Sequence, residues 1–134
     1  MLRLYDTNLT GQGLAPKSVE LSAFQRNLPI YVGRGALDKP VDIQVALKRE
    51  GREVMSRRHC KLEYSVPKDT WVVEDLGALN GVYVNYERIK GQVPLKDGDI
   101  LQLGGVAENV PKLSELCIRF KFEDLEGKES GKRK

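Results

Sequence analysis

The sequence is poor in side chains that bind metals. Its 134 residues include one histidine and two cysteines, and Cys60 and Cys117 stand far apart. A structural zinc site usually takes four ligands in closely spaced pairs, so we predict no metal site and no cofactor. Because the chain is 40% hydrophobic, a disulfide is not needed for stability, and both cysteines are predicted to be buried apolar side chains in a reducing compartment.

Long apolar runs are missing as well. No run approaches the ~20 residues that cross a bilayer, and the start of the chain has no apolar signal region and no cleavage motif. We therefore expect a protein inside the cell, in the cytosol or the nucleus, without membrane contact. The net charge of +3 is mild. It suits an acidic partner but does not require nucleic acid.

Helical periodicity and internal repeats are also absent, and short alternating or β-branched stretches take their place. Turn signals separate these stretches, as at Asp97-Gly98-Asp99, where glycine supplies a positive φ. About ten strands in a chain of ordinary domain size predict an all-β sandwich. The candidate strands are Leu2–Tyr5, Val19–Phe24, Ile30–Val32, Asp42–Leu47, His59–Tyr64, Thr70–Asp75, Val82–Asn85, Arg88–Lys90, Ile100–Leu103 and Leu116–Phe122.

The end of the chain is rich in charged residues and glycine and has no apolar anchor. We predict a folded domain over residues 1–123 and a disordered polar tail or linker over 124–134. Further turns are predicted over residues 8–13, 49–53 and 66–69. The core is predicted to include Trp71, Val73, Phe120 and Phe122.

Four short motifs follow one another along the chain. They are Gly33-Arg34, Ser56-Arg57-Arg58-His59-Cys60, residues 79–85 and residues 97–104. Each is weak alone, but together they resemble the forkhead-associated (FHA) domain, and most of all the FHA domain of a nuclear RING-finger ubiquitin ligase. The resemblance implies a β-sandwich of about eleven strands in two twisted sheets. It also implies a module that binds phosphothreonine peptides through loops at one end, is no enzyme, and acts in the nucleus in DNA-damage signalling.

The resemblance places the phosphate among three residues. It matches Arg34 and Ser56 to phosphopeptide-binding positions and Arg57 to a position that often touches the phosphate. A guanidinium presents a planar fork of donors, and a serine offers its hydroxyl and a nearby backbone amide. Gly33 is expected to let backbone approach closely. Arg58 is expected on the surface or rim, because neighbours in an extended segment point to opposite sides. The alternative is that all are solvated turn residues.

The resemblance also gives roles to the loop that follows. Asn80 matches an asparagine that hydrogen-bonds the peptide backbone, for which an amide offers a donor and an acceptor; the alternative is a turn asparagine. Gly81 would permit the tight geometry, and Asn85 would cap the next turn. Leu79 stands where many members of the family have serine or threonine, so the phosphate either loses one donor or gains an apolar wall.

His59 raises a catalytic alternative, because it is the only histidine and stands near Ser56. A serine-protease triad needs a buried acid and an oxyanion hole, and the sequence has no Gly-x-Ser-x-Gly elbow. In the family that the chain resembles, the matching histidine is structural and holds the serine-bearing turn through hydrogen bonds within the loops. We therefore predict a structural histidine and no enzyme.

Two other classes of function stay open. Nucleic-acid binding is suggested by the arginines, but it predicts aromatic side chains among them, and the sequence shows none near Arg57. The second is an FHA-like scaffold that self-associates or binds a partner through a sheet face. Our prediction is a monomeric phosphothreonine-binding module. The sequence does not identify its partner or the kinase that phosphorylates it.

Overall fold

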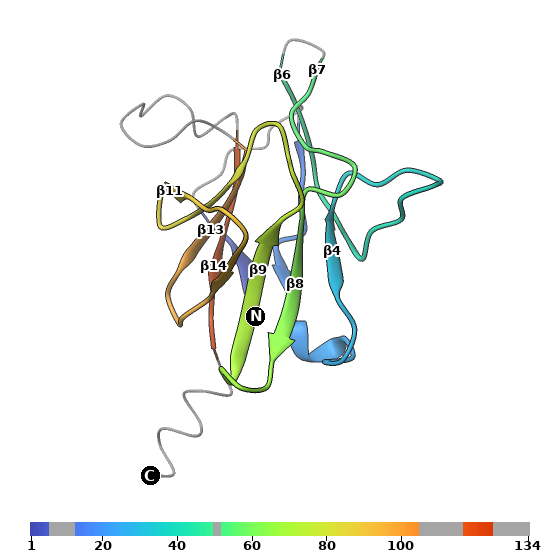
Figure 1. Cartoon of the computed structure of the whole chain (residues 1–134). Helices are drawn as coiled ribbons and strands as arrows, with labels where there is room; N and C mark the ends of the chain where they lie inside the picture. Colours follow the sequence, from blue (N-terminus) through green and yellow to red (C-terminus); the bar gives the residue numbers. More distant parts are fainter. Residues whose placement is uncertain (6–12, 50–51, 105–116, 125–134) are drawn as a thin grey trace.

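The computed structural model describes residues 1–5, 13–49, 52–104 and 117–124. These residues form fourteen strands and one short 3-10 helix, η1 (Leu21–Ala23). The strands make a six-stranded, a five-stranded and a three-stranded sheet, and Figure 1 shows the two larger ones as the layers of a sandwich. The predicted all-β sandwich is therefore confirmed.

The six-stranded sheet is antiparallel at every pairing. In its middle, Leu101 pairs with Phe120 and Leu103 pairs with Ile118, and all four side chains are fully buried. Because successive side chains of a strand point to opposite faces, these residues give the sheet one apolar inner face. The order is β11 (Glu87–Arg88), β10 (Val82–Val84), β13 (Ile100–Gly104), β14 (Cys117–Phe122), β1 (Leu2–Leu4) and β3 (Ser18–Val19).

The five-stranded sheet forms the other layer. Its central pair is a hairpin whose turn is closed by the amide of Asp69 donating to the carbonyl of Val66 at 3.2 Å, as predicted for residues 66–69. The order is β12 (Gln92–Pro94), β9 (Thr70–Asp75), β8 (Cys60–Ser65), β4 (Ile30–Gly33) and β5 (Ile43–Gln44). A third, small sheet contains β2 (Gly13–Leu14), β6 (Ala46–Arg49) and β7 (Arg52–Glu53).

One continuous core joins the two layers. Leu62 and Val73 come from the five-stranded sheet, Leu103 and Phe120 from the six-stranded sheet, and all belong to the same buried cluster. Trp71, Val73, Phe120 and Phe122 are buried, as predicted. The body of the sandwich is thus rigidly packed, and the connections at its ends are the parts left to bind a ligand.

Some strand predictions were wrong in detail. In the predicted strand Val19–Phe24, only Val19 belongs to a strand and Leu21–Ala23 form η1, in which Leu21 is buried. The predicted strand Asp42–Leu47 is divided into β5 and β6, so that each part pairs with a different sheet. Strand β12 was missed because it is a short edge strand that contains Pro94, and proline is confined to such edges.

The predicted turns at residues 66–69 and 97–99 are confirmed, whereas the turn predicted over residues 49–53 was too long: Arg49 ends β6, Arg52 and Glu53 form β7, and residues 50–51 lie outside the described residues. Gly98 has a φ of +91° between Asp97 and Asp99. Asn85 and Tyr86 have φ values of +51° and +70°, as in the two-residue turn of a hairpin, and they join β10 to β11. Residues 8–12 and 125–134, which belong to the predicted first turn and to the predicted tail, lie outside the described residues.

Phe120→Ala tests the core. We expect the variant to lower the free energy of unfolding by about 3–5 kcal/mol, because a fully buried aromatic ring is lost and a cavity remains. The neighbouring Lys121 is exposed, so Lys121→Ala should change stability by less than about 0.5 kcal/mol. Urea denaturation followed by tryptophan fluorescence measures both, and equal losses would contradict this assignment of faces.

Candidate functional site

The site begins where β4 ends, at Gly33. A Cβ on this residue would lie 2.2 Å from the carbonyl oxygen of Arg57 and 2.8 Å from that of Ser56, so only glycine allows the loop to pack here. Two backbone hydrogen bonds fasten the loop: the Arg34 amide donates to the Ser56 carbonyl at 3.1 Å and the Gly35 amide to the Arg57 carbonyl at 2.9 Å. The close backbone approach expected at Gly33 is therefore an approach by the serine-bearing loop.

The side chain of Arg34 lies along the same loop. Its Nε donates to the Met55 carbonyl at 3.0 Å and stands 3.9 Å from a carboxylate oxygen of Glu53. The side chain is 35% exposed. The guanidinium is thus fixed at one nitrogen beside Ser56 and remains accessible to solvent.

His59 joins two loops. Its Nδ1 accepts the Ser56 amide at 3.1 Å, and its Nε2 lies 2.6 Å from the Gly81 carbonyl. Because Nδ1 is an acceptor, the proton belongs on Nε2, which donates to Gly81. Burial lowers the pKa of His59, against the opposing effects of the Gly81 hydrogen bond and of Asp75. A neutral imidazole with both nitrogens occupied by backbone groups is not placed to act as a general base.

Ser56 has one donor left for a ligand. Its backbone amide is held by His59, so of the two donors expected at this position only the hydroxyl is uncommitted, and its oxygen forms no hydrogen bond with the described residues. The residue is half-buried. A ligand at Ser56 would therefore meet a fixed backbone and a hydroxyl that is free to rotate.

Asn80 ties the next loop to the same segment. Its Nδ2 donates to the Val54 carbonyl at 2.8 Å, two residues before Ser56. Gly81 has a φ of +79° and faces the guanidinium of Arg88, so this position requires glycine. Leu79 is 86% exposed, so its side chain lies at the surface and not in the core.

Asn85 lies elsewhere. Strand β10 separates it from Gly81, and its side chain donates to Asp99 at 2.9 Å and accepts the Ile100 amide at 3.0 Å. These bonds hold the β10–β11 turn against the start of β13. Asn85 is a turn residue of the sandwich, outside the loop cluster of Arg34, Ser56, His59 and Asn80.

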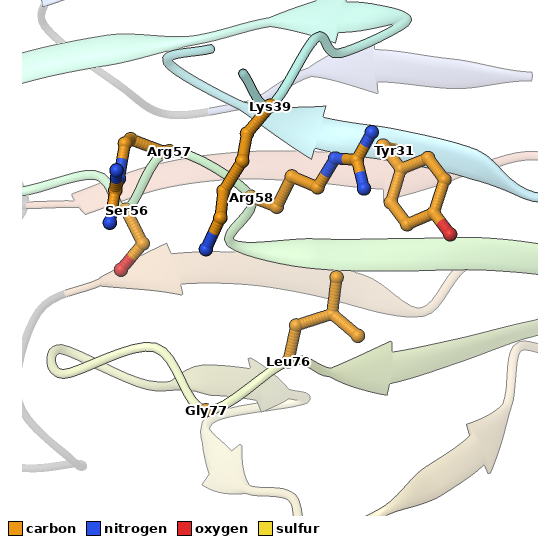
Figure 2. Close-up of a pocket in the computed structure, with 7 residues that line it drawn as sticks. All are labelled: Tyr31, Lys39, Ser56, Arg57, Arg58, Leu76 and Gly77. Carbon is orange, nitrogen blue, oxygen red and sulfur yellow. The ribbon is translucent and has the colours of Figure 1, made fainter. Parts of the chain in front are cut away.

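A cleft of about 420 Å³ opens beside Ser56. Figure 2 shows Lys39, Ser56 and Arg58 around it, with Leu76 below. The lining residues are Tyr31, Lys39, Ser56, Arg57, Arg58, Leu76 and Gly77. Arg34 and Asn80 are not among them, so the predicted residues divide between the loop junction and this cleft.

Two expectations about this region were wrong. Arg57 and Arg58 were expected in an extended segment, but both residues lie in a turn; their side chains diverge, as expected, and each lines the cleft (Figure 2). An aromatic residue was expected to be absent near Arg57, yet Tyr31 lines the same cleft, with the Arg58 guanidinium carbon 4.0 Å from its ring centre. Neither the turn at Arg57 and Arg58 nor the approach of Tyr31 can be predicted from the residues that are adjacent in the sequence.

Sequence reasoning missed Tyr31, Lys39, Leu76 and Gly77. The alternation of β4 gives a signal for Tyr31, since Ile30 and Val32 are buried on the inner face and the residue between them points outward. Lys39 had no such signal, because it stands in a connection whose course depends on the rest of the fold.

The described residues contain no group of three or more His, Cys, Asp and Glu side chains that could hold a metal ion. Cys60 and Cys117 are both buried, and burial raises the pKa of the Cys60 thiol. No helix in the described part of the chain is long and apolar enough to cross a bilayer.

Comparison with known proteins gives one family. The model of the FHA domain matches residues 30–104. The curated protein probable E3 ubiquitin-protein ligase dma1 of Schizosaccharomyces pombe is 31% identical over 106 residues, which cover 74% of this chain and 38% of the relative. The chain therefore spans less than two fifths of the length of that relative.

Two solved structures share the fold. The FHA-1 domain of Rv1747 from Mycobacterium tuberculosis has a TM-score of 0.52 and 22% identity, over 84% of this chain and 95% of that one. The N-terminal FHA domain of Rad53p from Saccharomyces cerevisiae, solved with a phosphothreonine peptide, has a TM-score of 0.53 and 15% identity, over 89% and 97%. At these identities the likeness concerns the fold.

The buried His59 predicts a pH dependence of stability. Its pKa is lower in the folded protein than in the unfolded chain, so the unfolded state binds the proton more readily. Stability is therefore full above about pH 6.5 and decreases as the pH falls from there toward the folded pKa, by at most about 1.4 kcal/mol per pH unit. We expect His59→Gln to remove this decrease.

The measurement is urea denaturation of both proteins between about pH 5 and pH 8. Because His59 is the only histidine, carboxyl groups and the amino terminus contribute equally to both curves, and the difference isolates the imidazole. Parallel curves for the two proteins would show that His59 is not held neutral by the fold.

Proposed function

Because this chain belongs to the FHA domain family, we propose that it is a phosphothreonine-dependent recognition module rather than an enzyme. The peptide would bind at the loop end of the sandwich, where Arg34, Ser56, Arg57, Leu79 and Asn80 are presented. The phosphothreonine peptide bound to the Rad53p domain, which shares the fold, supports this choice of ligand.

The observation that carries the proposal is the junction of Arg34 with Ser56. The backbones of these residues are joined by a 3.1 Å hydrogen bond, and the Arg34 guanidinium is held by the carbonyl of Met55, the residue before Ser56, so an arginine and a serine that are 22 positions apart in the chain meet at one loop junction. A phosphate oxygen can accept from both. Arg57, whose side chain is 47% exposed, supplies a second cation next to Ser56.

Asn80 and Leu79 would contact the peptide around the phosphothreonine. One N–H of the Asn80 amide is used by Val54, which fixes the direction of the side chain. The amide oxygen and the second N–H are the acceptor and the donor that an extended main chain needs. Leu79 would cover an apolar part of the peptide, since it is exposed beside Asn80.

These contacts are sufficient for a transient signalling interaction. A hydrogen bond to a charged group contributes about 1.5–3 kcal/mol, so two or three of them with main-chain contacts reach micromolar affinity, about −8 kcal/mol. The charge-assisted part depends on the phosphate. Binding should therefore weaken as salt rises.

Arg34→Ala and Ser56→Ala test the proposal. We expect each to reduce the affinity for phosphothreonine peptides by at least about tenfold, because each removes one charge-assisted hydrogen bond. Arg34→Lys keeps the charge but not the planar fork, so it should recover the affinity only in part. Calorimetric titration of a phosphothreonine peptide library and its unphosphorylated counterparts measures the effect.

Lys68→Ala is the control, because Lys68 is an exposed cation in the β8–β9 turn, away from the loops of the site. It should bind like the unchanged protein. Binding that ignores phosphorylation would refute the proposal. An unchanged unfolding midpoint in urea shows that the loss comes from the site and not from the fold.

One observation bears on the nucleic-acid alternative. Tyr31 is an aromatic residue beside three cations, but one of its faces is covered by Arg58, which leaves less ring for a base to stack on. A gel shift with single-stranded oligonucleotides separates the two functions. Sedimentation with and without phosphopeptide tests the monomer and the scaffold alternative, and imaging of the tagged protein before and after DNA damage tests the predicted nuclear role.

A further inference from the structure

The cleft beside Ser56 continues past the proposed phosphate site. It shares Ser56 and Arg57 with that site and then extends to Lys39, Arg58 and Tyr31. Its volume, about 420 Å³, falls in the range of clefts that enclose whole small molecules, about 300–1,000 Å³. The cleft is therefore larger than one phosphate group requires, and the question is what occupies the rest.

Arg58 is fixed at one wall of the cleft without losing its charge. Its Nε donates to the Pro40 carbonyl at 3.0 Å, and its guanidinium lies over the ring of Tyr31. Neither partner is an anion, and Arg58 forms no ion pair with any described residue. The remaining N–H groups are positioned in advance for an anionic ligand.

Lys39 reaches the cleft from the connection that follows β4, beside Arg58. Its backbone is held by two hydrogen bonds of 3.0 Å with Ala36, and Figure 2 shows its ammonium group projecting into the space between Ser56 and Arg58. In the part of the chain that the structure describes, this ammonium group has no carboxylate partner.

The nearby carboxylates do not neutralise these cations. Asp38 stands 3.9 Å from Arg57, but its side chain is 72% exposed, so the attraction is weak and screened. Asp75 accepts the amides of Gly77 and Ala78, and Asp42 accepts the amide of Tyr31 at 2.8 Å. A concave surface with excess positive charge concentrates the field and attracts anions.

We propose that Lys39, Arg58 and the rim of Tyr31 form a second anion subsite, which binds an acidic or phosphorylated side chain on the same peptide as the phosphothreonine. The inference rests on the proposed function. A peptide whose phosphothreonine lies at Ser56 is already in the cleft, and an extended chain advances about 3.3 Å per residue. The second negative group therefore belongs within a few residues of the first.

The experiment compares peptides that differ only in their second negative group. One series has a single phosphothreonine with neutral flanks, a second adds one glutamate, and a third adds one phosphothreonine, each walked along both sides of the first. The readout is the ratio of the dissociation constants of the singly and doubly charged peptides. At the best position we expect a ratio of about tenfold, larger with phosphate than with carboxylate.

Three variants locate the effect. Lys39→Met and Arg58→Gln remove one charge each and should lower the ratio to about threefold or less, whereas Lys68→Met, which removes a charge from the opposite turn, should leave it unchanged. An equal decrease in Lys68→Met would show general attraction and overturn the subsite. So would a ratio near one at every position, with binding of the singly phosphorylated peptide intact.

These outcomes are distinct from a failure of the proposed function. In that case neither the unchanged protein nor any variant binds the singly phosphorylated peptide more tightly than its unphosphorylated form. Because Lys39 is exposed, Lys39→Met should not disturb the fold. The ratio of dissociation constants measured for Lys39→Met therefore decides the proposal even if Arg58→Gln disturbs the packing against Tyr31.

Discussion

The loop end of the sandwich depends on the two hydrogen bonds that the neutral imidazole of His59 forms with backbone groups. One nitrogen accepts from the amide of Ser56 and the other donates to the carbonyl of Gly81, so a single buried ring fixes the relative position of the β7–β8 and β9–β10 connections. The Asn80 side chain, bonded to Val54, makes a second tie between the same segments. Because burial keeps the ring neutral, each nitrogen retains its role as donor or acceptor across the ordinary pH range.

Gly33 also helps to hold the loops together, because it leaves room for the backbone of the serine-bearing loop. The absence of a side chain lets Ser56 and Arg57 lie directly against the end of β4, and Arg34 follows in register with Ser56. The sandwich is rigid behind these loops, since the strands that lead into them bury their side chains in one core. Such a site loses little conformational freedom on binding, which is what a module with only a few charge-assisted contacts requires.

How much of this could be predicted depended on the range of the interactions. Long strands such as β8 and β14 could be predicted because buried and less buried residues alternate along their sequence. The turn at Gly98 could be predicted because glycine readily adopts the positive φ that the turn needs. The motif residues Arg34, Ser56 and Asn80 were found through resemblance to a family. The edge strand β12 has no fully buried residue, so its sequence shows no alternation from which it could be predicted. Lys39 and Tyr31 meet Arg58 only because β4, its following connection and the turn before β8 adjoin in space.

Two guanidinium groups at this end of the molecule are oriented by hydrogen bonds to neutral acceptors, and the carboxylates of Glu53 and Asp38 stand no closer than 3.9 Å to Arg34 and Arg57. Arg34 is oriented by the Met55 carbonyl, and Arg58 is oriented by the Pro40 carbonyl and the Tyr31 ring. A neutral acceptor fixes the direction of a guanidinium without cancelling its charge, whereas a carboxylate partner must be displaced or shared before an anion binds. The turn at Arg57 and Arg58 then brings sequence neighbours into one cleft. Neutral anchoring thus explains how the Arg58 guanidinium is held in place beside Lys39 and Arg57 and still keeps its charge available to a ligand that bears more than one negative group.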